Sequence, residues 1–129
     1  EAGVVSIFSK KILERKQPVI NGDGLQTRDY VFVEDVAAAN VLALETPETG
    51  AFNIGTSVET DVNLIFELVN KYFGADWKQV HCPSRPGEQT TSSLSYQKAK
   101  QVLRWQPKIK LEEGIKKTVE WFKSHPERV

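Results

Sequence analysis

The segment 22–36 constrains the fold of this chain more than any other part of the sequence. It opens with Gly-Asp-Gly, which favours a tight turn, because glycine tolerates positive φ angles and aspartate is common in turns. Residues 27–33 are mostly β-branched or aromatic, a composition typical of a strand. On such a strand Arg28 would share a face with Tyr30 and Phe32. An arginine in that setting needs an anion, a carboxylate or water as its partner.

The rest of the sequence alternates between helical and extended patterns. Apolar residues at helical spacing predict helices over residues 4–16, 36–44, 61–73, 96–103 and 111–123. Short runs predict strands over residues 19–20, 51–54 and 77–82, in addition to 27–33. This alternation indicates an α/β fold.

Individual residues set the ends and faces of these helices. Asp61 is a candidate N-cap for the third helix, and Gly74 is placed to end it. Ser95 is a candidate cap for the fourth. In the alanine-rich second helix, Val41 and Leu44 are expected to point inward. The last helix is expected to bury Ile115, Val119 and Phe122.

Composition is that of one globular unit. A chain of 129 residues can bury a single core. Seventeen basic and seventeen acidic residues cancel, so nothing indicates a nucleic-acid or membrane surface. The lone cysteine, Cys82, excludes an internal disulfide and suits a reducing compartment, so we expect a cytoplasmic protein. No apolar run approaches the roughly 20 residues of a membrane span. Because methionine is absent, we also expect a piece of a longer protein.

Four motifs occur in one order along the chain: residues 1–5, 22–45, 51–56 and 85–88. Together they resemble the extended short-chain dehydrogenase/reductases that modify nucleotide sugars, and within that group the UDP-glucose 4-epimerases. The resemblance covers nearly the entire chain. Relatives of this kind also carry a glycine-rich NAD-binding loop and a catalytic Tyr-x-x-x-Lys pair ahead of these motifs, and neither precedes them here.

The resemblance implies a C-terminal fragment, with NAD bound by an absent N-terminal part. Residues 1–30 and 75–110 would form the substrate-binding part of one incomplete unit. Residues 34–56 would return to the Rossmann-type sheet of the absent NAD-binding domain. We therefore expect exposed apolar surface, covered by that missing domain or by another copy of the chain, around Val36, Val41, Phe52 and Ile54.

The resemblance also implies a substrate site that binds a UDP-sugar. Arg28 and Arg85 would contact the diphosphate, since a guanidinium fork matches phosphate oxygens. Glu88 would accept hydrogen bonds from ribose hydroxyls, and the backbone groups of Val19 and Asn21 would read the pyrimidine edge. The N-terminus of the first helix could favour phosphate oxygens.

Plainer alternatives exist for several of these residues. Glu88 could form a salt bridge with Arg85, and Arg28 could pair with Asp29, Glu34 or Asp35. We expect no catalytic, NAD-binding or metal-binding residue in the chain. Tyr96 and Lys100 match Tyr-x-x-x-Lys by count, but they follow the substrate motifs, and an ordinary exposed helix face explains them better. His81 and Cys82 lack the partner pair that a zinc site needs.

These observations predict the nucleotide-sugar binding portion of an NAD-dependent UDP-sugar 4-epimerase of the UDP-glucose/UDP-galactose type, inactive alone. Two alternatives stay open: a fragment of an enzyme like dTDP-glucose 4,6-dehydratase, and a non-catalytic nucleotide-sugar binding or assembly module. The sequence leaves the sugar undetermined.

Overall fold

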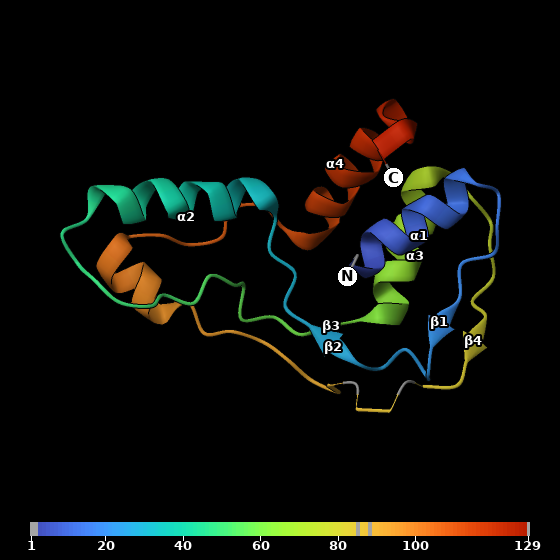
Figure 1. Cartoon of the computed structure of the whole chain (residues 1–129), viewed down its shortest axis with the longest axis horizontal. Helices are drawn as coiled ribbons and strands as arrows, with labels where there is room; N and C mark the ends of the chain where they lie inside the picture. The colour runs from blue at the N-terminus through green and yellow to red at the C-terminus, as the bar shows by residue number, and fades with distance from the viewer. Residues whose placement is uncertain (1–2, 85, 88, 129) are drawn as a thin grey trace.

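The computed structural model describes residues 3–84, 86–87 and 89–128 (Figure 1). Two groups of elements lie side by side. Helices α1 (Val4–Leu13), α3 (Val62–Phe73) and α4 (Leu111–Ser124) pack together at one end of the molecule. Helix α2 (Val33–Glu45) lies at the other end, next to the π-helix Ala99–Leu103. Arg85 and Glu88 lie outside the described residues.

Helix α3 is the centre of the larger core. The side chains of Ile65, Phe66 and Val69 are buried, and α3 packs against both α1 and α4. The core also contains buried residues from α1, β1 and α4, namely Phe8, Ile20, Ile115 and Val119. The interior therefore consists of helix-on-helix packing.

The predicted ends of α3 are confirmed. The Asp61 carboxylate accepts a hydrogen bond from the backbone N–H of Leu64 at 2.8 Å, which caps the helix start. Gly74 adopts a left-handed φ of 67°, which ends it. Helix α4 also buries the predicted Ile115, Val119 and Phe122.

Helix α1 is shorter than predicted. It ends at Leu13 rather than at residue 16, because Arg15 adopts a left-handed φ of 53°. The N–H of Lys16 still donates to the carbonyl of Lys11 at 2.8 Å, so the chain turns off the helix end before Pro18. The short 3-10 helix Pro126–Arg128 follows α4 at the other end of the chain.

The strands form two separate pairs, each two residues long. Strand β1 (Ile20–Asn21) pairs in parallel with β4 (His81–Cys82), and β2 (Thr27–Arg28) pairs antiparallel with β3 (Thr60–Asp61). The longer strand predicted over 77–82 is thus limited to its last two residues.

The predicted strand over 27–33 is wrong beyond Arg28. After β2 the Asp29 carboxylate binds other loops, and α2 already begins at Val33. Glu34 and Asp35 in the first turn favour a helix start, because negative charge stabilises a helix N-terminus. The β-branched composition alone is thus a misleading guide to this segment. The strand predicted over 51–54 is also absent, since no described strand pairs with it.

Helix α2 takes part in a second, smaller cluster. Its buried members are Ala39, Ala99, Leu103 and Trp105. The expected exposed apolar surface is confirmed in part. Val41 is 55% exposed, whereas Val36 is half-buried, and Phe52 and Ile54 are half-buried against this cluster.

The inward orientation predicted for Val41 and Leu44 is wrong within this chain, since Leu44 is 88% exposed. Residues between 96 and 105 also pack against α2. Most of the helix predicted over 96–103 is a π-helix, Ala99–Leu103. The hydroxyl of Ser95, the predicted cap, accepts only a long hydrogen bond of 3.5 Å from the N–H of Gln97. No helix among the described residues is long and apolar enough to cross a membrane.

Candidate functional site

A cavity of about 710 Å³ opens between α1, β1, β2 and the described loop residues Pro86, Gly87 and Gln89. Three of the five predicted site residues line it, namely Val19, Asn21 and Arg28. The remaining walls are apolar side chains and loop residues, including Val4, Ile7, Phe8, Ile20, Tyr30, Val62, Pro86, Gly87 and Gln89. The structure therefore brings these three residues together, while their roles stay predictions.

Strand β1 presents one backbone edge to this cavity. The N–H groups of Ile20 and Gly22 donate to carbonyls of the β4 side, at Val80 and Cys82, both at 2.8 Å. Because backbone groups alternate along a strand, those of Val19 and Asn21 face the opposite edge. Val19 and Asn21 both line the cavity, so their backbone N–H and C=O groups are placed where they could hydrogen-bond a nucleobase.

Arg28 lies on β2 and lines the cavity, and its guanidinium is hydrogen-bonded to two backbone carbonyls. Its Nη1 donates to the carbonyl of Thr27 at 2.7 Å and to that of Gln89 at 2.8 Å. The second of these bonds ties Gln89 to β2. A guanidinium has five N–H donors, so Nε and Nη2 keep three, and none of them donates to another described residue.

The alternative pairings of Arg28 do not occur. Each of the three candidate carboxylates has other partners. Asp29 accepts from the backbone amides of residues 56, 57 and 94, and Asp35 accepts from those of residues 108 and 109. The Glu34 carboxylate lies 3.8 Å from the Lys117 ammonium. None of these three carboxylates therefore competes for the Arg28 guanidinium.

The electrostatics of the cavity favour an anion. Among its described lining residues Arg28 is the one charged side chain, and none is a carboxylate. Gly3 and Val4 at the start of α1 also line the wall, and a helix N-terminus carries partial positive charge. Burial raises the pKa of the Tyr30 hydroxyl. The charge of Arg28 lowers this pKa and that of Asp61 raises it, and the net shift is upward. The hydroxyl is therefore a neutral hydrogen-bonding group.

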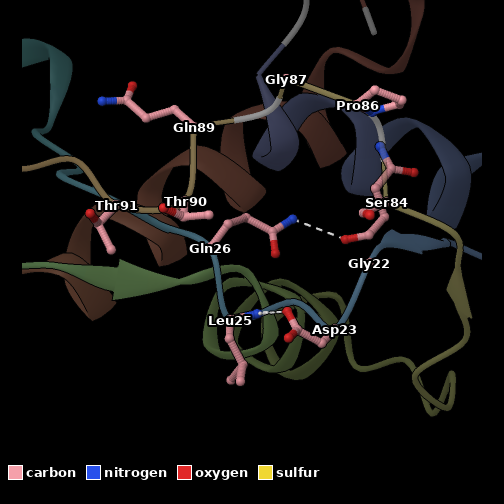
Figure 2. Close-up of a pocket in the computed structure, with 11 residues that line it drawn as sticks. Gly22, Asp23, Leu25, Gln26, Ser84, Pro86, Gly87, Gln89, Thr90 and Thr91 are labelled. Carbon is pink, nitrogen blue, oxygen red and sulfur yellow. Dashed lines mark hydrogen bonds between the residues drawn. The ribbon is translucent and has the colours of Figure 1, made fainter.

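A smaller cavity of about 520 Å³ adjoins the first (Figure 2). It lies between the turn 22–24 and the described residues 84, 86–87 and 89–91. The two cavities share Asn21, Gln26, Pro86, Gly87 and Gln89. Its lining is mixed and includes the hydroxyl side chains of Ser84, Thr90 and Thr91 as well as Leu25 and Pro86.

The predicted turn is confirmed and is fixed by α3. Gly22 and Gly24 have φ values of 69° and 75°. The carbonyl of Gly24 accepts from the N–H groups of Val62 and Asn63 at 3.0 and 3.3 Å, at the start of α3. A Cβ atom at position 24 would collide with the side-chain amide of Asn63, so the close approach requires glycine.

Asp29 organises the chain just behind Arg28. Its carboxylate accepts from the N–H groups of Thr56, Ser57 and Leu94 at 2.8, 2.9 and 3.1 Å. Burial raises the pKa of this carboxyl, but these bonds and the Thr56 hydroxyl outweigh it and leave the pKa below its usual value. Asp29 is therefore ionised and joins three loops at the end of β2.

The two remaining predicted site residues, Arg85 and Glu88, fall outside the described residues. Their described neighbours Pro86 and Gly87 line both cavities. The predicted salt bridge between Arg85 and Glu88, and their predicted ligand contacts, therefore stay predictions.

Comparison with known proteins identifies the family. A family model described as GDP-mannose 4,6 dehydratase matches residues 3–118. The chain belongs to this family of extended short-chain dehydrogenase/reductases. Its curated relatives include nucleotide-sugar 4-epimerases and 4,6-dehydratases.

Among these relatives, the UDP-glucose 4-epimerase of Mycolicibacterium smegmatis is 44% identical over 96% of this chain and 40% of its own length. A putative UDP-glucose 4-epimerase from Methanocaldococcus jannaschii is also 44% identical, over 97% of this chain and 40% of its own length. The crystal structure of the UDP-glucose 4-epimerase of Thermotoga maritima with UDP-glucose is 47% identical, with a TM-score of 0.92 over 98% of this chain and 41% of that one. The chain thus spans about 40% of the length of the relatives it matches.

A dinucleotide site of the usual family type does not fit the described residues. Some solved relatives of this extended short-chain dehydrogenase/reductase are complexes with NAD, such as the UDP-glucose 4-epimerase of Thermus thermophilus, 36% identical with a TM-score of 0.85 over 95% of this chain and 40% of that one. The present turn has glycines at 22 and 24 but threonine at 27, and it opens onto β2 instead of a helix. The helix N-terminus that holds a pyrophosphate in a Rossmann loop is therefore missing from this turn.

Other polar residues of the family chain have structural partners. Tyr96 packs edge-on against Trp105, with ring centroids 5.9 Å apart, and neither Tyr96 nor Lys100 lines the cavities. The Nδ1 of His81 lies 2.8 Å from the carbonyl of Gly22, and the Cys82 thiol donates to the Asn21 side chain at 3.1 Å.

Gln26, Tyr30 and Gln89 are polar residues of the larger cavity that were not predicted from the sequence as site residues. Alternation along a strand places Tyr30 beside Arg28 but indicates no role for it. Gln26 had a usable signal, since it lies two residues before Arg28 and so on the same side of an extended segment.

Proposed function

We propose that this chain is the substrate-binding portion of an NAD-dependent UDP-sugar 4-epimerase of the UDP-glucose/UDP-galactose type. The observation that carries the proposal is the larger cavity, in which Arg28 meets the open backbone edge of β1. The two epimerases 44% identical to this chain, and the 47% identical structure with UDP-glucose, support the same substrate class.

The chemistry of the cavity suits a nucleoside diphosphate. The remaining Nε and Nη2 donors of Arg28 can bind two phosphate oxygens in one plane. The apolar wall formed by Val4, Ile7 and Val19 can cover the face of a base. A diphosphate carries negative charge into a cavity whose described lining has only positive charge. With Arg85 and Glu88 added, the proposed site contains all five predicted residues.

The same proposal assigns NAD to a part of the protein beyond these 129 residues. When bound, NAD takes up and returns a hydride in enzymes of this class. The residues of this chain would hold the nucleotide and orient the sugar, and the chain alone would be inactive. The exposed Val41 and Leu44 on α2 would be covered by that additional part, since the relatives are about two and a half times as long. The free thiol of Cys82 suits a cytoplasmic setting.

Calorimetric titration with UDP and UDP-glucose tests the binding claim. We expect both to bind, and Arg28→Gln to weaken the affinity roughly 10- to 100-fold, the worth of hydrogen bonds to a charged group. Arg104→Gln is the matched control, because Arg104 is an exposed arginine remote from the cavity lining. Equal affinities for wild type and Arg28→Gln would contradict the proposal.

A second assay addresses the reaction. The chain, alone and mixed with the NAD-binding segment of an epimerase relative, is incubated with UDP-galactose, and UDP-glucose formation is followed. We expect turnover only in the mixture. Conversion of dTDP-glucose to a 4-keto-6-deoxy sugar would instead support the dehydratase alternative, which the 30% identity to the human dTDP-D-glucose 4,6-dehydratase favours. Binding with no turnover of either sugar would support a non-catalytic module.

A further inference from the structure

Gln26 stands at the boundary between the two cavities and lines both of them. Its side chain is half-buried and extends across the smaller cavity from the strand side (Figure 2). The proposed function uses Arg28 and the edge of β1 but gives Gln26 no role.

The orientation of its amide is fixed by one hydrogen bond. Nε2 of Gln26 donates to the backbone carbonyl of Asn21 at 3.0 Å. A carbonyl can only accept, so the nitrogen of the amide must face Asn21 and the oxygen must point elsewhere. A carboxamide has two N–H donors and an acceptor oxygen, and no further hydrogen bond joins this one to a described residue. One donor and the acceptor therefore stay available, in one plane and in a known order.

This bond also changes the expected readout by β1. The carbonyl of Asn21 is one of the groups predicted to read a pyrimidine, and it already has a donor in Gln26. That carbonyl keeps a second lone pair, and Oε1 of Gln26 provides a further acceptor on the same hydrogen-bonded path. Because Gln26 and Arg28 line the same cavity two residues apart, base and phosphate recognition would lie on one short segment.

We propose that Gln26 determines base specificity by pairing its carboxamide with the imide edge of uracil or thymine. In this pairing Oε1 accepts from the base N3–H, and the available N–H of Nε2 donates to the adjacent base carbonyl. Cytosine has an unprotonated N3 at that position, so two acceptors would face each other while Asn21 holds the amide in place. The inference rests on the proposed function, since it needs a nucleotide in the larger cavity.

The ratio of UDP to CDP affinity is the readout, measured by calorimetry on the protein and its variants. We expect the wild type to prefer UDP roughly tenfold or more, the discrimination of a good two-point amide–base pair. Gln26→Met keeps the length of the side chain but removes both polar groups, so the ratio should fall to about one. Gln101→Met, at an exposed glutamine in the π-helix, is the matched control and should keep the wild-type ratio.

A ratio is insensitive to partial unfolding, because a lower fraction of active protein affects both nucleotides equally. If UDP binds and Arg28→Gln weakens it, but Gln26→Met leaves the ratio unchanged, the role of Gln26 is overturned while the proposed function stands. If neither UDP nor CDP binds the wild type, both are overturned. Gln26→Asn supplies a further test, since the shorter amide should also lose the preference.

Discussion

Helices α3 and α2 are of similar length, but they are stabilised in different ways. Helix α3 buries five residues, has a side-chain cap at its start and a left-handed glycine at its end. Helix α2 buries only Asp35 and Ala39 and has no side-chain cap. Besides the apolar contacts of Ala39 and Leu42, it is held by polar groups of Asp35. The Asp35 carbonyl accepts from the Trp105 indole, and its carboxylate accepts from two backbone amides.

This difference bears on the site. The cavity is built on the larger core, since the turn 22–24 is bonded to the start of α3 and the wall of the cavity includes α1. Stability near the ligand should therefore follow the packing of α3. The α2 region should instead respond to the loss of individual polar contacts, because little apolar area holds it.

The largest effect is expected for Phe66→Ala. Phe66 is 1% exposed and packs edge-on against Phe8, with ring centroids 5.6 Å apart. Truncation should lower the free energy of unfolding by about 3–5 kcal/mol. Urea denaturation measures this. The control, Leu44→Ala on the exposed face of α2, should change it by no more than about 0.5 kcal/mol. Similar losses for the two variants would contradict the comparison.

A smaller loss is expected for Asp35→Ala. Its carboxylate accepts from the N–H groups of Lys108 and Ile109, both at 3.0 Å, although the residue is buried. Removing it leaves these donors unpaired and should cost about 1–3 kcal/mol. Hydrogen exchange should then rise around α2 and residues 99–109 but not in α3. Exchange that rises equally in α3 would show that the two regions unfold together. Asp35→Asn, which keeps an acceptor, should restore part of the protection.

Asp61→Ala tests the cap of α3 and should cost about 1 kcal/mol. The N–H of Leu64 loses its 2.8 Å acceptor, and the helix start becomes less ordered. Since the neighbouring amides of Val62 and Asn63 hold the Gly24 carbonyl, UDP affinity should fall as well. Asp61→Asn is the control, because asparagine caps a helix about as well as aspartate. Denaturation and calorimetry on the same samples give both values.

How far the sequence predicts this structure also differs between the two regions. The ends of α3 could be predicted because they depend on local signals, namely a capping aspartate and a terminal glycine. The strand expected over 27–33 could not, because its β-branched composition does not reveal that Asp29 bonds residues 56, 57 and 94. Helical spacing predicts Val41 and Leu44 inward, yet both are exposed among the described residues.

The candidate site shows the same limit. Val19, Asn21 and Arg28 could be selected from motifs, and the fold brings them to one cavity. Strand alternation could have placed Gln26 on the same side as Arg28, but its hydrogen bond to the Asn21 carbonyl is visible only in the structure. Their roles in binding are predictions that the titrations above address.

The smallest effect is a pH dependence from Asp29, which is half-exposed and so partly screened by solvent. Burial raises its pKa, but the hydrogen bonds from Thr56, Leu94 and Ser57 leave the folded-state pKa below the usual 3.8. A carboxyl with a lowered pKa stabilises the folded state fully above its unfolded pKa, and this contribution is lost as the pH falls through the folded value. Wild type should therefore lose stability below about pH 4 more steeply than Asp29→Asn. Urea midpoints measured between about pH 2.5 and 6, values chosen to span that transition, test this. Parallel curves for the two proteins would mean that Asp29 does not connect the three loops in solution, and the steeper slope of the wild type would show that it does.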